Sequence, residues 1–163
     1  MTQIYAEVLS VVQRQSVPNI FMKKLFGTDG IRGIAGKYPF EADVVKRIGY
    51  AAAMVVNNSP KKEFVIGCDT RESSSWISNA VAEGIMSAGV SVFDCGVIST
   101  PAISYITSRR GSSAGCVISA SHNLSEFNGI KFFSSDGIKI SDGKELEISI
   151  KIIIFAKSII KSI

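Results

Sequence analysis

This sequence has very little histidine and no closely spaced cysteines. His122 is the single histidine in 163 residues, and Cys68, Cys95 and Cys116 never form a C-x-x-C pair. A structural zinc site needs about four such ligands close together, so we expect no zinc site made by this chain alone. An odd, widely spaced set of cysteines in strand-like segments is typical of small buried side chains in a reducing compartment. The cysteines therefore predict a cytoplasmic protein.

Long apolar runs and dense basic stretches are also lacking. No segment has the roughly 18 apolar residues that a membrane-spanning helix needs, so we expect no membrane partner. The formal net charge is +4, but lysine and arginine are interspersed with acidic residues along the chain. Single-stranded nucleic-acid readers usually carry a basic stripe interleaved with aromatics, and none is present here. No nucleic-acid partner is predicted, and a small phosphate is the favoured anion.

The two ends of the chain differ in composition from its centre. Residues 1–22 lack the basic start and unbroken apolar core of a signal peptide, so we interpret them as an N-terminal extension, with Met22 as an alternative start. Half of residues 148–163 are isoleucine, and this low diversity predicts an aberrant tail rather than a well-specified core helix. The segment between them, residues 23–147, is predicted to be the folded domain.

Strand-like and helix-like segments alternate through the central part of the chain. Helical spacing of apolar residues and buried-looking apolar runs predict four helices and four strands, with Ser74 or Ser75 capping the second helix and Asp142 with Glu145 forming a capping box for the last. The predicted strands are 64–68, 90–96, 114–119 and 129–134, and the helices are 41–56, 74–89, a short one ending at 109–110 and one from 142. Such alternation predicts an α/β fold, a three-layer α/β/α sandwich with a mixed sheet of about four strands.

Four glycines recur every three residues, at 27, 30, 33 and 36. This short period lacks the intervening prolines of collagen, so we interpret residues 25–39 as a loop whose backbone approaches another group closely. Arg32 lies in this segment, and its guanidinium fork suits a phosphate held by two hydrogen bonds.

A polar stretch interrupts the third predicted strand. Ser119 ends the strand, and Ser121, His122 and Asn123 follow it at the edge where α/β sheets bind ligands. Small residues there would leave backbone N–H groups accessible to a phosphate. Lys131, for which we expect no acidic neighbour, would neutralise charge. The residues predict an anion site near Ser121, although a histidine that simply satisfies a polar turn is about equally common.

Two other arrangements of these residue types carry less weight. Residues 111–115 match G-x-S-x-G, but a nucleophile elbow lies between a strand and a helix, and this segment lies between a helix and a strand. Ser121 and His122 are not expected to form a hydrolase pair, because neighbouring side chains in an extended strand point to opposite faces.

Four stretches together resemble the phosphohexomutase superfamily, most closely its bacterial phosphoglucosamine mutase branch. They are "LFGTDGIRG" at 25–33, "GCDTR" at 67–71, "GVISTPAISYIT" at 96–107 and "GCVISASHNLSEFNGIKFFSSDGIKISD" at 115–142. The resemblance implies an N-terminal α/β/α domain whose active serine, at position 121, carries a phosphoryl group. It also implies that His122 and Lys131 are catalytic and that Arg32 and Asn123 bind phosphate.

The resemblance further implies the reaction and its partners. The substrate would be a sugar phosphate, with glucosamine 6-phosphate converted to glucosamine 1-phosphate, a precursor of peptidoglycan amino sugars. A magnesium ion would bind the phosphate on Ser121, with its other ligands outside this chain. Because one domain alone cannot position a reaction shared among several, we expect the chain alone to be inactive. We also expect self-association through the surface that faces the second domain in the family.

The sequence departs from the family pattern at three positions, and two alternatives stay open. Leu124 stands where the family usually has proline, Phe127 where it has an aspartate, and Cys68 where it has an arginine. One alternative is a non-catalytic remnant or interaction module that keeps the fold. The other is a fragment of a phosphomannomutase or phosphoglucomutase.

Overall fold

A computed structural model describes residues 25–56 and 59–160 of the chain, with side chains through residue 154. The predicted N-terminal extension of residues 1–22, including Met22, lies outside the described residues. So does the end of the isoleucine-rich tail, residues 161–163.

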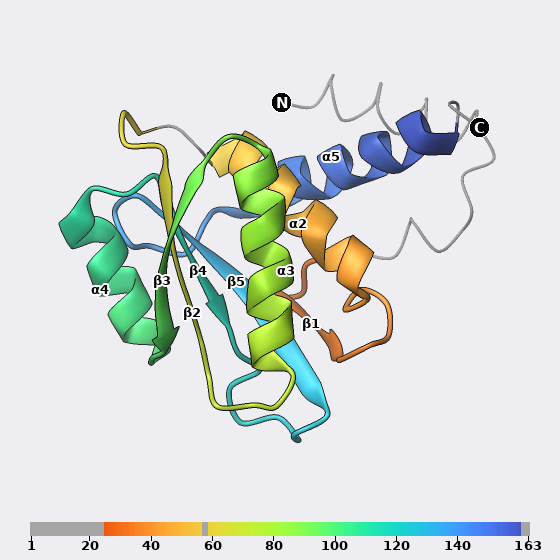
Figure 1. Ribbon diagram of the computed structural model, residues 1–163, viewed down its shortest axis with the longest axis horizontal. Coiled ribbons are helices and arrows are strands. Elements are labelled where there is room, and N and C mark those ends of the chain that lie inside the picture. Colours follow the sequence, from red (N-terminus) through yellow and green to blue (C-terminus); the bar gives the residue numbers. More distant parts are fainter. Residues whose placement is uncertain (1–24, 57–58, 161–163) are drawn as a thin grey trace.

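The domain is built on a mixed sheet of five strands (Figure 1). The strands are β1 (Ile31–Ile34), β2 (Glu63–Cys68), β3 (Ser91–Val97), β4 (Ala114–Ile118) and β5 (Phe127–Ser134). They lie in the order β1-β5-β4-β2-β3. Strands β3, β2 and β4 are parallel, whereas β5 is antiparallel to both β4 and β1. The predicted α/β class and mixed sheet are confirmed.

Strand β1 corrects the interpretation of the glycine-rich segment as a loop throughout. Ile31 is fully buried and pairs with Ile130 of β5, so this part of the segment is an edge strand. The three-residue glycine period hides the strand, because it breaks the two-residue alternation by which a strand is normally detected. Gly30 has a φ of 86° and lies against the backbone of β5, which is the close approach that the glycines predict.

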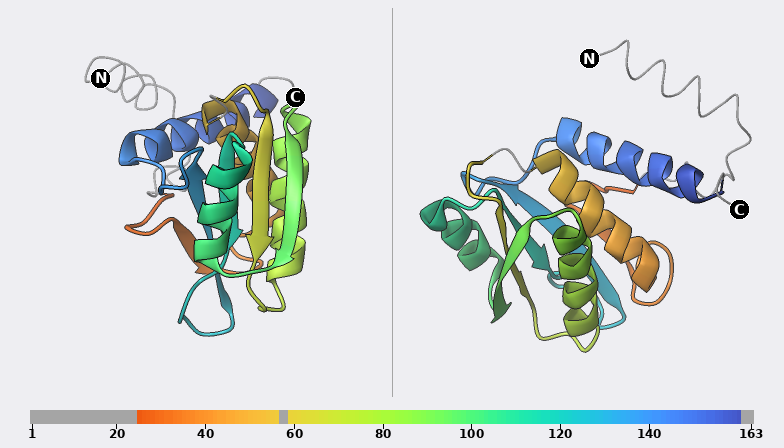
Figure 2. Two further views of the ribbon diagram at one scale, coloured as in Figure 1. Left: turned by 90° about the vertical axis from the view of Figure 1, so that its left-hand side faces the viewer. Right: turned by 45° about the horizontal axis from the view of Figure 1, so that its top comes forward.

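Helices cover both faces of the sheet (Figure 2). One layer holds α2 (Ala42–Val56), α3 (Ser74–Ser87) and α5 (Asp142–Ile160), and the other holds α4 (Thr100–Arg110). Side chains alternate along β2, so that Phe64 and Ile66 join the larger core under the first layer and Val65 joins a smaller core with Ile103 of α4. The arrangement is the predicted three-layer sandwich.

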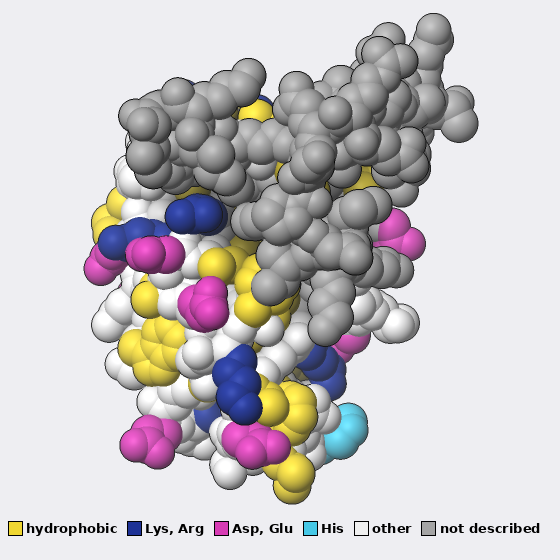
Figure 3. All heavy atoms as spheres, turned by 90° about the vertical axis from the view of Figure 1, so that its right-hand side faces the viewer, with side chains coloured by type: hydrophobic (Ala, Val, Ile, Leu, Met, Phe, Trp, Pro, Cys, Tyr) yellow, Lys and Arg dark blue, Asp and Glu magenta, His cyan; other side chains and the backbone are white. Residues whose placement is uncertain are grey.

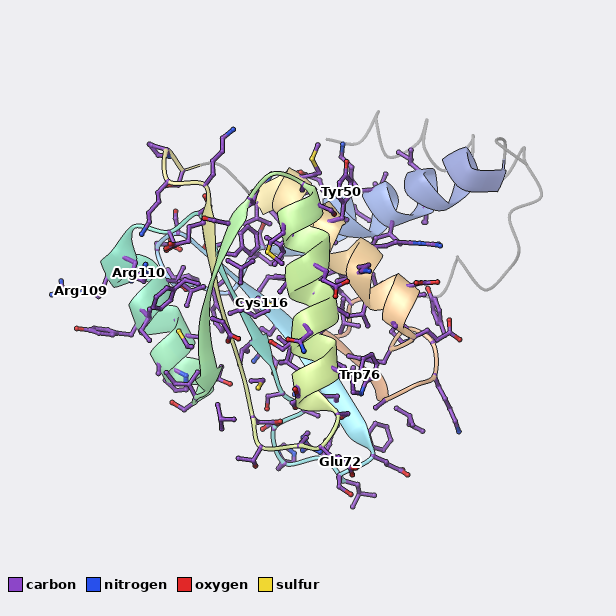
Figure 4. All side chains as sticks on the ribbon, in the orientation of Figure 1. Tyr50, Glu72, Trp76, Arg109, Arg110 and Cys116 are labelled. Atoms are coloured by element: carbon purple, nitrogen blue, oxygen red, sulfur yellow. The ribbon has the colours of Figure 1, made fainter. Side chains whose placement is uncertain are left out.

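The cysteines occupy the strands as expected. Cys68 and Cys116 are buried, Cys95 is partly buried, and all three are free. Cys116 lies between the sheet and the α2–α3 layer (Figure 4). Burial raises the pKa of each thiol, which favours the protonated form, the less nucleophilic one. In the described part of the chain, no helix is long and apolar enough to cross a membrane.

Two helix starts differ from their predicted caps. Helix α3 begins at Ser74, but the Ser74 hydroxyl donates to the Asp69 carboxylate at 2.6 Å instead of capping the helix. Helix α5 begins at Asp142, where the Ser141 hydroxyl accepts from the Lys144 N–H at 3.4 Å. The predicted capping box with Glu145 does not form, because that side chain is buried in an ion pair with Lys139 at 2.6 Å. In both cases, tertiary partners take the side chain that local pattern assigned to a cap.

Helix α5 runs through the predicted division between residues 147 and 148. Ile148 and Ile152, on the far side of this division, are buried in the larger core. The first turns of the isoleucine-rich tail are therefore packed on the domain, against α2.

Helices α2 and α3 cross at a close backbone contact made by two glycines. A Cβ at Gly49 of α2 would overlap the carbonyl oxygen of Val81, and a Cβ at Gly84 of α3 would overlap that of Lys46. Backbone atoms cannot move aside as a flexible side chain can, so each glycine fixes the distance between the two helices.

We expect Gly84→Ala to destabilise the domain by about 1–3 kcal/mol, because the added methyl forces α2 and α3 apart. Urea unfolding followed by circular dichroism measures the change. Gly143→Ala is the matched control, because a Cβ at Gly143 would meet only the Ser141 hydroxyl, at 3.8 Å. The free energy of unfolding of this variant should stay within about 0.5 kcal/mol of the wild-type value. Equal stability of the two variants would contradict the close helix contact.

Candidate active site

The loop of residues 119–126 connects β4 to β5 at the carboxyl end of the parallel strands. The turn after β2, which contains Asp69 and Arg71, lies beside it at the same end of the sheet (Figure 1). Glu72 of this turn is labelled in Figure 4. Because β2 and β4 are parallel neighbours, their ends bring these two polar segments together.

Ser121 occupies a left-handed backbone conformation with a φ of 58°, the only positive φ among the described non-glycine residues. Its side chain is exposed, and its Oγ lies 3.3 Å from Nδ1 of His122. The expectation that these two side chains point to opposite faces is therefore wrong. That expectation assumed an extended strand, and the left-handed turn instead brings the hydroxyl and the imidazole side by side. Figure 3 shows the histidine, in cyan, at the surface.

The loop uses part of its own hydrogen-bonding capacity to hold this turn. The Ser121 N–H donates to the Ser119 hydroxyl at 3.0 Å, and the Asn123 N–H donates to the Ala120 carbonyl at 3.2 Å. The prediction of a cradle of accessible N–H groups is wrong for these two groups, which are committed within the loop. The turn presents the Ser121 hydroxyl rather than these two donors.

Arg71 holds the loop from the neighbouring turn. Its Nη2 donates to the carbonyl oxygens of Ser121 at 3.0 Å and Asn123 at 2.8 Å. Its Nη1 donates to those of Leu124 at 2.7 Å and Phe127 at 3.1 Å. One guanidinium therefore satisfies four carbonyls, and its side chain is only 12% exposed. A charged, planar donor of this kind makes stronger and more directional hydrogen bonds than a neutral one.

Asp69 orients the guanidinium and ties it to the rest of the domain. Its carboxylate accepts from Nε of Arg71 at 3.0 Å and from the Ser74 hydroxyl at 2.6 Å. Burial raises the pKa of Asp69, but hydrogen bonds from Ser74, Ser119 and Arg71 outweigh burial, and the net pKa lies below its usual value. The carboxylate thus stays charged beside Arg71 at neutral pH.

The three departures from the family pattern surround this network. Leu124 is 72% exposed, Phe127 is half-buried at the start of β5, and Cys68 is buried at the end of β2. The Leu124 and Phe127 carbonyls both accept from Arg71, so the backbone of the loop is held independently of these side chains. Next to Phe127, the fully buried Asn128 donates to the hydroxyls of Ser73 and Ser74 at 2.9 and 3.0 Å.

Arg32 and Lys131 lie on adjacent strands and share one acidic partner. Arg32 of β1 pairs with Gly129 of β5, two residues before Lys131, so the two cations lie on the same face of the sheet. Asp29 accepts from Nη2 of Arg32 at 3.1 Å and lies 2.7 Å from Nζ of Lys131. The expectation that Lys131 lacks an acidic neighbour is wrong, because the 25–33 segment folds back onto β5. The hydrogen bond from Lys131, partly opposed by burial, lowers the pKa of Asp29.

The predicted site residues thus form two groups. Ser121, His122 and Asn123 lie together in the loop, and Arg32 and Lys131 lie together on β1 and β5. No hydrogen bond or ion pair joins the two groups within residues 25–56 and 59–160. Their link is the backbone, since the Ser119 N–H donates to the Gly129 carbonyl at 2.9 Å.

A magnesium site is not formed by these residues alone. Across the described ranges, no group of three or more histidine, cysteine, aspartate or glutamate side chains is placed to hold a metal ion. The two carboxylates of the site are already engaged, Asp29 by Lys131 and Arg32, and Asp69 by Arg71 and Ser74. The described side chains do not fit a complete magnesium site.

The family model for the alpha/beta/alpha domain I of phosphoglucomutase/phosphomannomutase matches residues 23–155. The chain belongs to this family. The resemblance to the phosphohexomutase superfamily is confirmed.

Relatives of this phosphohexomutase domain include two bacterial phosphoglucosamine mutases. The one from Geobacter metallireducens is 50% identical over 139 residues, which cover 85% of this chain and 30% of the relative. The one from Koribacter versatilis is 50% identical over 132 residues, which cover 80% and 28%. The chain therefore spans about 30% of the length of these curated relatives.

Solved structures agree with the fold. A crystal structure described as a phosphomannomutase from Thermus thermophilus has a TM-score of 0.71 and 25% identity, covering 78% of this chain and 29% of that one. A phosphoglucomutase/phosphomannomutase family protein from Burkholderia thailandensis has a TM-score of 0.69 and 28% identity, covering 82% and 30%.

Asp69 and Arg71 of this phosphohexomutase domain have no role predicted from the sequence beyond their place in the family-like stretch at 67–71. A signal was present, because a charged pair directly follows a buried strand at the edge where ligands bind. The role was missed because the carbonyls that Arg71 binds lie after β4, at its end of the sheet, and the sequence alone does not show that β4 is the neighbour of β2.

We expect Asp69→Asn to reduce the free energy of unfolding at pH 7 by about 1–3 kcal/mol, since Arg71 loses a charged acceptor. The folded-state pKa of Asp69 is lowered, so this contribution is full above the unfolded pKa and is lost as pH falls through the folded value. The difference from wild type should therefore shrink below about pH 4.

Urea titrations of both proteins between neutral and acidic pH measure this difference. Glu126→Gln is the control, because it removes an exposed carboxylate from the same loop. A gap between wild type and Asp69→Asn that stayed constant with pH would rule out the charged role of Asp69.

Proposed function

We propose that this chain is the phosphoserine-bearing domain of a phosphoglucosamine mutase, with Ser121 as the residue that carries the phosphoryl group. One observation supports this most directly. The Ser121 hydroxyl is exposed on a left-handed turn whose carbonyls are fixed by a largely buried guanidinium. A hydroxyl held in this way suits in-line transfer of a phosphoryl group, which depends chiefly on positioning.

In the proposed cycle, phosphoserine 121 donates its phosphoryl group to the 1-hydroxyl of glucosamine 6-phosphate. The P–O bond to serine breaks, a P–O bond to the sugar forms, and glucosamine 1,6-bisphosphate results. The bisphosphate reorients, and its 6-phosphoryl group transfers back to the Ser121 oxygen. Glucosamine 1-phosphate leaves, and the phosphoserine is restored.

The proposal gives each neighbouring residue a role. Nδ1 of His122, 3.3 Å from Oγ, is placed to exchange a proton with the serine oxygen. Arg32 and Lys131 would bind phosphoryl oxygens, exchanging part of their interaction with Asp29 for one with the more highly charged phosphate. Asn123 contributes through its backbone in the unphosphorylated loop, and its side chain is proposed to bind phosphate.

Magnesium enters the proposal only through the phosphoryl group on Ser121. The remaining ligands would come from outside the described residues, as would most contacts to the sugar. We therefore propose that this chain alone does not complete the cycle. The proposal also includes a cytoplasmic location, where thiols such as those of Cys68 and Cys116 stay reduced.

Incubation of the full chain with glucosamine 1,6-bisphosphate should add one phosphoryl group to Ser121. Intact-mass measurement and peptide mapping detect it. Ser121→Ala should remove the modification, whereas Ser125→Ala, which deletes an exposed hydroxyl from the same loop, should keep it. Labelling that persists in Ser121→Ala would disprove the assignment of the nucleophile.

The same preparation should not convert glucosamine 6-phosphate to glucosamine 1-phosphate at a measurable rate, because the chain spans about 30% of its curated relatives. A coupled assay for glucosamine 1-phosphate measures this, with an intact phosphoglucosamine mutase as the positive control. Turnover comparable to that control would contradict the proposed need for further domains.

Self-association through the surface that faces the second domain in the family is a further part of the proposal, and exposed apolar side chains would strengthen it. Val97, Tyr105 and Ile138 are each more than 60% exposed. We expect light scattering to show species larger than a monomer, increasing with concentration. A single monomeric species over the whole concentration range would contradict it.

A further inference from the structure

We propose that Arg71 is the positioning residue of the Ser121 loop, which it holds in the conformation that lets the serine accept a phosphoryl group. This inference rests on the proposed function of Ser121. It adds a residue to which neither the family match nor the relatives assign a task. Arg71 does not contact the serine hydroxyl, so its effect would be exerted through the backbone of the loop.

The first argument is the distribution of its hydrogen bonds. The four carbonyls that accept from Arg71 span the loop from Ser121 to Phe127. Loop 119–126 is too long for a tight two-residue hairpin. The Phe127 N–H also donates to the Leu124 carbonyl, at 3.1 Å, but Arg71 is the donor that all four carbonyls share. A guanidinium offers up to five N–H donors in one plane. The Arg71 guanidinium makes four hydrogen bonds to these carbonyls and one to Asp69.

The second argument is that Arg71 is itself held on two sides. Nε donates to Asp69, and the Arg71 N–H donates to the same carboxylate at 3.1 Å. Asp69 in turn accepts from Ser74 at the start of α3, and its own N–H donates to the Ile118 carbonyl at the end of β4 at 2.9 Å. Through Asp69, the guanidinium is thus held in place by the end of β2, the start of α3 and the end of β4. The loop that it binds is thereby restrained relative to these three elements.

The third argument is the backbone strain at Ser121. A non-glycine residue at positive φ is disfavoured and persists only where surrounding contacts over-determine it. The Ser121 N–H is fixed by Ser119 and its carbonyl by Arg71, so the peptide groups on both sides of this residue are restrained. Removing Arg71 releases one side, and the serine is then free to return to a common conformation in which Oγ no longer lies beside His122.

The test compares Arg71→Ala, Arg71→Lys and the control Arg109→Ala in the full chain. Arg109 is an exposed arginine of α4 whose guanidinium lies over the Tyr105 ring, at the end of α4 labelled in Figure 4. Each protein is incubated with glucosamine 1,6-bisphosphate over a range of concentrations, and the rate of Ser121 phosphorylation is measured by intact mass. Hydrogen exchange of residues 119–128 in the absence of the bisphosphate, and thermal unfolding, are measured in parallel.

For Arg71→Ala we expect the maximal labelling rate to fall by about tenfold to a hundredfold, with a smaller change in the half-saturating concentration, because misplacement of a reacting group affects the rate more than binding. Exchange in residues 119–128 should rise about tenfold or more, while cooperative thermal unfolding is retained. Arg71→Lys, which keeps the charge but not the planar fork, should restore part of the rate. Arg109→Ala should match wild type.

The outcomes separate this inference from the proposed function. If wild type and Arg71→Ala are labelled at the same rate, the positioning role is disproved even though Ser121 is the nucleophile. If wild type is not labelled, the proposed function fails, and hydrogen exchange still decides whether Arg71 orders the loop: faster exchange in Arg71→Ala supports it, and unchanged exchange overturns it. A Lys variant as slow as the Ala variant, with the loop still protected, would also count against positioning by hydrogen bonds.

Discussion

The interaction between the Arg71 guanidinium and the carbonyls of the 119–127 segment is the constraint on which the rest of the site depends. Some carbonyls of a loop this long find a donor nearby, as the Ala120 carbonyl does in the Asn123 N–H, and the others need water or a donor from elsewhere. Arg71 supplies that donor from the turn after β2, and Asp69 orients it. The left-handed turn at Ser121, its exposed hydroxyl and the contact with His122 all lie in the segment that this one side chain holds.

The order of strands in the sheet explains how Arg71 reaches the loop. Parallel pairing of β2 with β4 brings the ends of two strands, far apart in the sequence, to one edge, so that a turn and a loop become neighbours. The antiparallel strand β5 then carries the chain back and sets Lys131 beside Arg32 of β1. In the helical layer on one face of the sheet, glycines at the α2–α3 crossing let two helices pack closely. The sheet thereby holds two sets of polar groups, one in the turn after β2 and the loop after β4, and one on β1 and β5.

Acidic residues complete the electrostatics of the site. Asp69 pairs with Arg71, and Asp29 pairs with Arg32 and Lys131, so each of these three cations has an acidic partner. The carboxylates of Asp69 and Asp29 differ in their exposure and in the groups that they hold. Asp69 lies within a network of partly buried hydrogen bonds that holds Arg71 beside the loop. The side chain of Asp29 is 45% exposed, and the cations that it holds are 33% (Arg32) and 23% (Lys131) exposed. The phosphoryl group proposed on Ser121 carries more charge than Asp29 and would compete with it for these cations.

The sequence by itself determined the α/β class, most element positions and the identity of the polar loop, because hydrophobic periodicity, turn residues and the motif at 115–142 are local properties of the chain. Tertiary structure decided the rest. It made an edge strand of Ile31–Ile34, gave Lys131 an acidic partner, took Ser74 and Glu145 from their predicted caps, and turned Ser121 toward His122. Each of these outcomes depends on how the chain folds around the residue. Local pattern shows that a polar side chain needs a hydrogen-bond partner, but only the packed sheet decides which partner is within reach.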